Sequence, residues 1–176
     1  ECIRKHMPSV KIIAGNVATP RAVRDLAEWG ADIVKVGIGQ GSPCTTKDKT
    51  GFTIPMFTCV KQCSNITLDN GYTVPIIADG GVRCNGDIAK AIVAGALAVM
   101  SGSLFASCTD SPASIIEIDG IKHKAYFGSA SAENKGHNNH IEGKLNKIST
   151  NGMSVGAKLL EITQDLQSSI SYAGGD

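Results

Sequence analysis

The first 110 residues alternate between short apolar runs and helical patterns, and this alternation is the strongest constraint on the fold. Four apolar runs are predicted to be β-strands: 10–17, 31–39, 73–81 and 96–106. The helices predicted between them span 19–30, 55–64 and 85–96. Strands joined through helices pair in parallel, because the crossover returns the chain to the same end of the sheet. The sequence therefore predicts an α/β fold built on a parallel sheet.

Local signals support these elements. Thr19 and Pro20 are typical of a helix start, and Gly30 of a helix end. The run 10–17 is apolar enough to predict a fully buried strand. Val60 is predicted to pack against the sheet from its helix.

The remainder of the chain predicts a different organisation. A hairpin is expected over 114–128, with Asp119–Gly120 as its tight turn. The polar stretch 131–140 is too poor in apolar residues to form core and suits a mobile flap. The chain closes on an amphipathic helix whose apolar stripe comprises Val155, Leu159, Ile162, Leu166 and Ile170.

Four strand–helix units are too few to close an eight-stranded barrel. The opening residues, ECIRKHMPS, have the pattern of the end of a helix. We therefore expect 1–176 to be the second half of a (β/α)8 TIM barrel, strands 5–8, within a single catalytic domain. In this interpretation 1–110 holds the βα units, 111–150 the hairpin and flap, and 151–176 the C-terminal helix. A small open α/β sheet is the alternative.

Composition narrows the class of protein. A net charge of +1 gives no support for nucleic acid or a membrane surface as partner. No apolar run approaches the roughly 20 residues that span a bilayer, and no secretory leader is visible. The six cysteines have irregular spacings, which predicts reduced thiols and a cytoplasmic location. Cys59 and Cys63 are expected to be buried core thiols.

The stretch VGIGQGSPCTTKDKTG, residues 36–51, places a thiol in a polar, glycine-rich loop after the second strand. A thiol attacks only as the thiolate, which backbone N–H groups, Lys47 and Lys49 are expected to favour. In an extended loop residues i and i+2 point the same way, so Thr46 should lie beside Cys44 and exchange a proton with it. We interpret Cys44 as a nucleophile; a loop cysteine without a role is the alternative.

Glycine loops follow three of the strands. Gly37, Gly39 and Gly41 alternate, which leaves carbonyls that can surround a monovalent cation. The loops ADGG (78–81) and SGS (101–103) combine polar side chains with exposed N–H groups suited to a ribose diol and a phosphate. In eight-stranded barrels phosphate binds at the loops after the last two strands, which these would be. Glycines that merely permit tight turns are the alternative.

Other polar residues carry weaker signals. IEGK, residues 141–144, contains a single carboxylate, Glu142, for which a solvated surface position is the ordinary interpretation. His123, His137 and His140 lack metal-ligand spacing and are interpreted as surface side chains.

Several segments together resemble the inosine monophosphate (IMP) dehydrogenase and guanosine monophosphate (GMP) reductase superfamily. These are IAGNVAT, VGIGQGSPCTT, PIIADGG, AVMSGSLFA and YFGSAS, in the family order and over most of the chain. The family fold is a complete (β/α) barrel. CTTKDKTGF, the position of IEGK and the ending EITQDLQSSISYAGG are similar to the reductase branch, and bacterial reductases in particular.

The resemblance implies a mechanism. Cys44 would attack C2 of the guanine of GMP, expel ammonia and form a covalent thioimidate. Thr46 and Glu142 would handle the protons of the departing ammonia. A hydride from NADPH would then reduce C2 and release IMP, a reaction of purine salvage.

The resemblance also implies binding residues and partners. Positions matched to nucleotide contacts are Ser42, Asp79, Gly80, Gly81, Gly102, Ser103, Gly128, Ser129 and Ala130. Positions matched to carbonyl ligands of potassium are Gly39, Gly41, Cys44 and Lys47. Cofactor contacts are not assigned beyond Gly37 and Gly39, because the Tyr-Arg pair of some reductases is replaced by Asn138 and Asn139. The partners implied are GMP and IMP, and relatives form homotetramers.

Two other functions stay open at this point. An IMP dehydrogenase would oxidise IMP with NAD and water, although its water-activating Arg-Tyr pair has no counterpart between Ser131 and Lys144. A non-catalytic nucleotide- or phosphate-binding barrel would keep ADGG and SGS but have no use for a thiol followed by Thr46.

Overall fold

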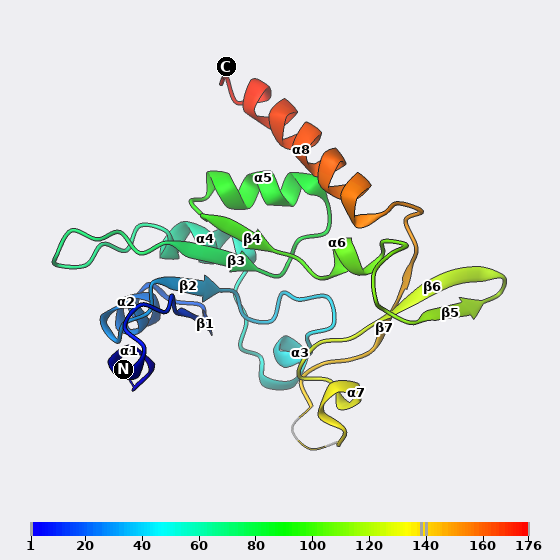
Figure 1. Cartoon of the computed structure of the whole chain (residues 1–176), viewed down its shortest axis with the longest axis horizontal. Helices are drawn as coiled ribbons and strands as arrows, with labels where there is room; N and C mark the ends of the chain where they lie inside the picture. The colour runs from blue at the N-terminus through cyan, green and yellow to red at the C-terminus, as the bar shows by residue number, and fades with distance from the viewer. Residues whose placement is uncertain (1, 138, 140, 176) are drawn as a thin grey trace. The chain divides into compact units, whose positions relative to one another are not determined.

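The computed structural model describes residues 2–137, 139 and 141–175, which form two compact units (Figure 1). The first unit contains residues 2–40, 53–80 and 90–100. The second contains residues 41–52, 81–89 and, among the described residues, those from 101 to 175. Because the units interleave along the chain, each draws on distant parts of the sequence.

A four-stranded parallel sheet organises the first unit. Its strand order is β1–β2–β3–β4, with Ile13 opposite Ile33 and Val34 opposite Ile76. The strands are β1 (Ile13–Val17), β2 (Ile33–Val36), β3 (Ile76–Asp79) and β4 (Ala98–Met100). The predicted α/β class and parallel sheet are confirmed.

Helix α1 (Cys2–His6) precedes β1. The helices α2 (Pro20–Glu28), α4 (Met56–Cys63) and α5 (Asn85–Val93) lie between the strands in sequence and begin and end close to the predicted residues. Along the chain, α5 begins in the second unit and ends in the first. Thr19 caps α2, since its Oγ1 accepts a hydrogen bond from Ala22 N–H at 3.3 Å. Gly30 follows this helix with a φ of 102°, which favours glycine and stops the helix.

The core of the first unit lies between the sheet and its helices. Val34, Val36 and Ile76 point to this face of the sheet and are at most 1% exposed. Val60 packs there from α4 and is fully buried, as predicted. Burying such side chains stabilises the fold by about 1.5–3 kcal/mol each.

All six cysteines are free thiols, and Cys59 and Cys63 are fully buried in this core. Both findings confirm the predictions. The hydrogen bond to Cys59 and burial together raise the pKa of the Cys63 thiol far above its usual range. Because both side chains are fully buried, no substrate can reach either sulfur, and the two thiols are packing groups rather than nucleophiles.

Two strand predictions are wrong in extent. The strand predicted over 10–17 was expected to be fully buried, yet Ile13 is 56% exposed, because β1 is an edge strand of the described sheet. The strand predicted over 96–106 ends at Met100, and Ser103–Ala106 forms the short helix α6. The helical turn starts there because Ala106 N–H bonds to the Gly102 carbonyl at 2.8 Å.

A three-stranded antiparallel sheet, order β5–β6–β7, lies in the second unit (Figure 1). The strands are β5 (Ile115–Ile118), β6 (Ile121–Tyr126) and β7 (Asn146–Ser149). The predicted hairpin is confirmed: Asp119 and Gly120 form its turn with φ values of 52° and 76°. Strand β7 was not predicted.

The helices of the second unit are α3 (Thr46–Thr50), α6, α7 (Ala132–Lys135) and α8 (Val155–Tyr172). Helix α7 begins inside the predicted flap, where its cap Ser131 is fully buried and residues 133–137 are exposed. Two members of that stretch, Asn138 and His140, lie outside the described residues.

The apolar stripe predicted for α8 is covered only in part. Ile162 is 8% exposed, whereas Leu159 and Ile170 are 49% and 53% exposed. Beside Ile162 the contact is polar, because Asn85 Nδ2 donates to Glu161 and Asp165 at 2.8 and 2.7 Å. Among the described residues no helix is both long and apolar enough to cross a membrane.

Asp32 ties the first helix to the start of β1. Its carboxylate accepts from Ile12 N–H at 2.8 Å, from the Arg4 guanidinium, and from Lys11 Nζ at 3.1 Å. These partners, the Ile12 N–H foremost, hold the pKa of Asp32 well below its usual range. A carboxyl group with a lowered folded-state pKa stabilises the fold above its unfolded pKa of about 3.9.

We expect Asp32→Asn to lower the urea midpoint at pH 7 and to flatten its dependence on pH. In the parent, this contribution is lost as the pH falls from about 5 through the acid range, because the group must be protonated. Urea unfolding at several pH values measures the effect. Asp25→Asn is the matched control, since Asp25 is 41% exposed and 4.0 Å from its partner Arg21. If the urea midpoint of Asp32→Asn depended on pH as steeply as that of the parent, the stabilising role of this carboxylate would be contradicted.

Candidate active site

Three predicted side chains form a continuous hydrogen-bonded chain in the second unit. Cys44 Sγ donates to Thr46 Oγ1 at 3.3 Å, and Thr46 Oγ1 donates to Glu142 Oε2 at 2.6 Å. All three side chains are half-buried. The thiol proton therefore has a direct path through a hydroxyl to a carboxylate 96 residues further along the chain.

Thr46 lies beside Cys44 for a different reason from the one predicted. The loop is not extended there, because Thr46 is the first residue of the short helix α3. Thr45, with φ −114° and ψ 7°, turns the chain so that the hydroxyl returns toward the sulfur. The predicted neighbourhood is found, although the predicted geometry is wrong.

Backbone hydrogen bonds hold the 142–144 segment against the cysteine loop. Cys44 and Gly143 form an antiparallel bridge. Thr45 N–H donates to the Glu142 carbonyl at 2.9 Å, and Lys144 N–H donates to the Pro43 carbonyl at 2.8 Å. The position of the carboxylate is thus fixed by main-chain geometry on the side facing the thiol.

The opposite side of this segment is also held. Glu142 N–H donates to the Ala130 carbonyl at 3.1 Å. Gly143 is buried, and a Cβ there would lie 2.9 Å from Ser131 N, so only glycine fits without displacement. The 142–144 segment therefore fills a slot between two loops.

The two lysines expected to favour the thiolate differ. Lys49 Nζ donates to the Ile141 carbonyl and so binds the residue that precedes Glu142. The side chain of Lys47 is exposed. Lys49 thus acts on the carboxylate segment rather than directly on Cys44.

In the first unit, predicted residues gather where β3 ends. Asp79 Oδ2 accepts from Lys35 Nζ at 2.8 Å and from Asn16 Nδ2 at 3.0 Å. Asn16 also donates to the Gly37 carbonyl at 3.0 Å. Asn16 and Lys35 were not predicted; the signal was available, since each is a polar residue inside or at the end of an apolar strand.

Gly80 belongs to this group as well. Its N–H faces the Met100 carbonyl at 3.4 Å, across from the end of β4. Gly37 approaches the Asp79 backbone so closely that a Cβ would lie 2.3 Å from the Asp79 carbonyl oxygen. The strand-end glycines Gly37 and Gly80 are thus accounted for by packing in this unit, and their ligand contacts stay predictions, as do those of Gly39 and Gly81.

The predicted phosphate loop of the second unit lies beside an unpredicted tyrosine. A Cβ on Gly102 would lie 2.0 Å from Tyr126 Oη, so the glycine admits the phenol. Ser103 is the first residue of α6, and its Oγ donates to the Val82 carbonyl at 3.4 Å. Gly102 and Tyr126 also line a pocket of about 500 Å³.

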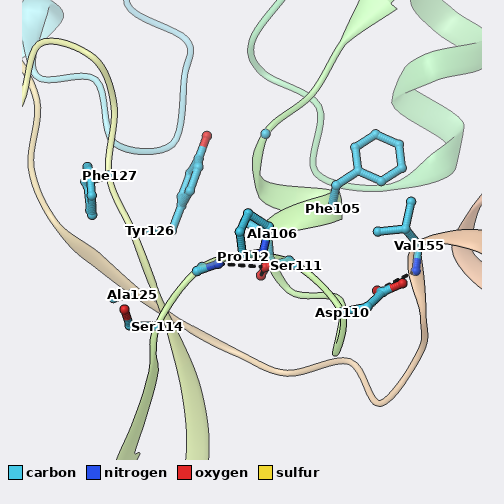
Figure 2. Close-up of a pocket in the computed structure, with 12 residues that line it drawn as sticks. Phe105, Ala106, Asp110, Ser111, Pro112, Ser114, Ala125, Tyr126, Phe127 and Val155 are labelled. Carbon is cyan, nitrogen blue, oxygen red and sulfur yellow. Dashed lines mark hydrogen bonds between the residues drawn. The ribbon is translucent and has the colours of Figure 1, made fainter. Parts of the chain in front are cut away.

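The pocket has mostly apolar walls (Figure 2). Phe105 and Val155 lie on one side of it, and Tyr126 and Phe127 on the other. Loop residues 110–114 complete its lining, and Asp110 in this loop accepts from Val155 N–H at 2.8 Å. The backbone of Gly102 and the phenol of Tyr126 therefore lie at the wall of a mostly apolar pocket.

The remaining predicted nucleotide contacts lie in the loops that hold the 142–144 segment. Gly128 packs against Pro43, which leaves 3.3 Å between an added Cβ and Pro43 Cγ. The carbonyls of Ser129 and Ala130 accept from Asn134 Nδ2 and Glu142 N–H at 3.0 and 3.1 Å. Ser42 Oγ, near the cysteine, accepts from Asn146 Nδ2 at 2.9 Å.

The potassium ligands predicted for this loop are backbone carbonyls, and two of them already accept one hydrogen bond each. Gly41 O accepts from Cys44 N–H at 3.0 Å, and Lys47 O from Gly51 N–H at 3.1 Å. A carbonyl oxygen has two lone pairs, so each can accept one further ligand. Gly39 falls in the first unit and the other three in the second, and potassium binding stays a prediction. Within the described ranges, no three His, Cys, Asp or Glu side chains cluster in a way that could hold a metal ion.

Comparison with known proteins decides the family. The IMP dehydrogenase / GMP reductase domain family matches residues 1–175. The chain belongs to this family.

Several curated members of the family are named GMP reductase. The GMP reductase of Chromobacterium violaceum is 50% identical over 173 residues, covering 98% of this chain and 53% of its own length. Those of Paracidovorax citrulli and Staphylococcus epidermidis are 49% and 53% identical over 175 and 174 residues, each covering 98% of this chain and 52% of their own. The chain spans about half the length of the curated relatives it matches.

We expect Gly143→Ala to lower the free energy of unfolding by about 1–3 kcal/mol, because the added methyl meets backbone rather than a movable side chain. Urea unfolding measures this. Gly156→Ala, in the same unit, is the matched control, because the nearest atom to its Cβ is Ser154 Oγ at 3.9 Å and alanine favours the helix. Equal stability of Gly143→Ala and the parent would show that the slot is not tight.

Proposed function

We propose that the protein is an NADPH-dependent GMP reductase, which converts GMP to IMP and ammonia. The observation that carries the proposal is the hydrogen-bonded chain from Cys44 through Thr46 to Glu142. A thiol needs a proton acceptor to become a nucleophile, and ammonia needs a proton donor to depart, so one relay serves both steps. Membership of the family and the names of the similar relatives support the same activity.

In the first step, Cys44 Sγ forms a bond to C2 of the guanine ring. Its proton passes to Thr46 Oγ1, while the Thr46 proton passes to Glu142. As the C2–N bond breaks, Thr46 passes the proton that came from the thiol to the amino group, which leaves as ammonia, and Glu142 returns its proton to Thr46. The product on the enzyme is a thioimidate, in which C2 has exchanged nitrogen for sulfur.

In the second step, bound NADPH would supply the hydride that reduces C2. As the C2–S bond breaks and IMP is released, the thiolate of Cys44 takes up a proton from solvent, because the original thiol proton has left with ammonia. Thr46 can pass this proton to the sulfur, because it lies within hydrogen-bond distance of both Sγ and Glu142. The half-buried setting of the three side chains limits the access of water, which would otherwise attack the thioimidate.

The nucleotide phosphate has a suitable place in the same unit. Gly102 precedes α6 and Ser103 is its first residue, so both contribute backbone N–H groups at the start of the helix, and the Tyr126 phenol lies against Gly102. We assign phosphate binding to Gly102, Ser103 and Tyr126. The ribose contact of Asp79 and Gly80 stays a prediction.

The decisive assay follows absorbance of the reduced nicotinamide in the full-length protein. GMP with NADPH should consume the reduced cofactor, whereas IMP with NAD should give no reduction. Cys44→Ala should abolish turnover, because no other group in the relay can form the covalent bond. Activity only with IMP and NAD would assign the protein to the dehydrogenases, and undiminished turnover by Cys44→Ala would exclude the covalent mechanism.

A purely nucleotide-binding protein is tested by alkylation. Iodoacetamide should modify Cys44, and GMP should protect it, because the base lies on the sulfur in the proposed complex. Cys84 is exposed and serves as the internal control whose labelling GMP leaves unchanged. Equal labelling of Cys44 with and without GMP would contradict this placement of the base.

We expect Thr46→Val and Glu142→Gln each to reduce kcat by about 100-fold or more, because each interrupts the proton path. Glutamine can still accept the hydrogen bond from Thr46 but cannot take up its proton. Because the two residues act in one relay, the double variant should be at most about 3-fold slower than the slower single variant. Steady-state kinetics measures this.

Two matched variants control for general damage. Thr46→Ser keeps the hydroxyl and should retain most of the activity. Glu133→Gln removes an exposed carboxylate in the neighbouring α7 and should behave as the parent does. Independent, multiplicative losses for Thr46→Val and Glu142→Gln would show that the two side chains do not share a proton path.

A further inference from the structure

A lysine is buried where the proposed mechanism does not use one. Lys124 lies in β6, the central strand of the three-stranded sheet, and is only 2% exposed. Its Nζ donates to the carbonyls of Thr109, Ser111 and Ala113 at 3.1, 2.9 and 3.3 Å. Buried lysines are rare, because removing an ammonium from water is costly unless its hydrogen bonds are replaced.

The three acceptors identify the form of this side chain. A carbonyl can only accept, so three bonds require three N–H donors, which the ammonium has and the neutral amine lacks. In the described part of the chain no carboxylate is hydrogen-bonded to it, and the nearby Asp110 accepts from Val155 N–H instead. The positive charge is therefore held by backbone dipoles alone.

The carbonyls belong to the loop that follows α6. This helix begins with the proposed phosphate residues Gly102 and Ser103, and residues 110–114 of the loop line the pocket beside them. Lys124 thus ties the far end of the phosphate helix to β6.

The same strand carries the other wall of the phosphate site. Tyr126 follows Lys124 by two residues in β6, so the two side chains leave the strand on one face. Tyr126 Oη lies 2.0 Å from the position that a Cβ on Gly102 would take. A second bond, from Ala125 N–H to the Ser114 carbonyl at 2.9 Å, joins strand and loop between them.

We propose that Lys124 is a positioning residue for the nucleotide phosphate, an inference that rests on the proposed function. Its ammonium holds the 109–113 loop and thereby sets the distance between Tyr126 and the Gly102–Ser103 turn. It does not touch the substrate. The relay of Cys44, Thr46 and Glu142 is held by its own backbone bonds, so loss of the ammonium acts on phosphate binding and leaves the chemistry intact.

The first test separates binding from chemistry in the full-length protein. Lys124→Met keeps the apolar stem and removes the donors, and should raise KM for GMP by about 10-fold or more while kcat changes by less than about 3-fold. Lys122→Met is the matched control, since Lys122 lies two residues earlier in β6 and is exposed. A loss in kcat alone, or an equal effect of Lys122→Met, would overturn the proposal.

The second test is specific to the phosphate and does not need turnover. Protection of Cys44 from iodoacetamide is measured by peptide mass spectrometry at increasing concentrations of GMP or of guanosine, which lacks the phosphate. In Lys124→Met the half-protecting GMP concentration should rise by about 10-fold or more, with that of guanosine unchanged. Equal shifts for both ligands, or none, would overturn the proposal while leaving the proposed function in place.

Failure of the proposed function and loss of folding in the variants each have their own readout. If the parent is not protected by GMP and does not oxidise NADPH, the proposed function fails and this inference fails with it. Three unsatisfied buried carbonyls destabilise the fold, so Lys124→Gln, with two N–H donors, is measured beside Lys124→Met. A folded Lys124→Gln, checked by circular dichroism, should show a smaller but still phosphate-specific shift; parent-like protection by GMP would overturn the proposal.

Discussion

The main-chain pairing of residues 142–144 with the cysteine loop is the interaction on which the site depends. It joins two segments that lie about a hundred residues apart, through main-chain N–H and carbonyl groups rather than through side chains. Side chains set the chemistry, but the pairing decides that the carboxylate of Glu142 meets the hydroxyl of Thr46 at all. Gly143 allows the pairing, because a larger residue would push the segment away from Ser131.

In the first unit, the polar groups come from side chains on the strands of the parallel sheet. In β2 and β3 every second residue is buried in the core, and the alternate positions include Lys35 and Asp79. Two half-buried charges, 26% and 23% exposed, pair with one another, and Asn16 supplies a further donor. One face of these strands thus packs in the core, and the other presents charged groups toward the carboxyl ends, where functional residues lie in (β/α) barrels.

The sequence predicted the parts of the fold that are governed by short-range patterns. Periodicity and caps located the four parallel strands, α2, α4 and the Asp119–Gly120 turn, because these follow from local conformational preferences. It overestimated the burial of β1 and the length of β4, since both depend on neighbours that periodicity does not reveal. Strand β7 was missed because three of its four residues, Asn146, Lys147 and Ser149, are polar, so no apolar alternation marks a strand there.

In the candidate site, too, contacts between residues close in sequence were predictable and contacts between distant residues were not. Cys44 and Thr46 are two residues apart, so their proximity was predictable, whereas the partnership with Glu142 was implied only by family resemblance. The sequence did not predict the burial of Lys124, because a lysine in a hairpin ordinarily lies at the surface. Only the folded loop supplies its three carbonyl acceptors.

The same main-chain pairing links the thiol of Cys44 to the carboxylate of Glu142. If the 142–144 segment separates from the cysteine loop, Cys44 keeps its hydrogen bond to Thr46, but Thr46 loses the carboxylate of Glu142. What remains is an ordinary cysteine with an ordinary glutamate elsewhere. The hydrogen-bonded chain from sulfur to carboxylate therefore exists only while the main-chain pairing is intact.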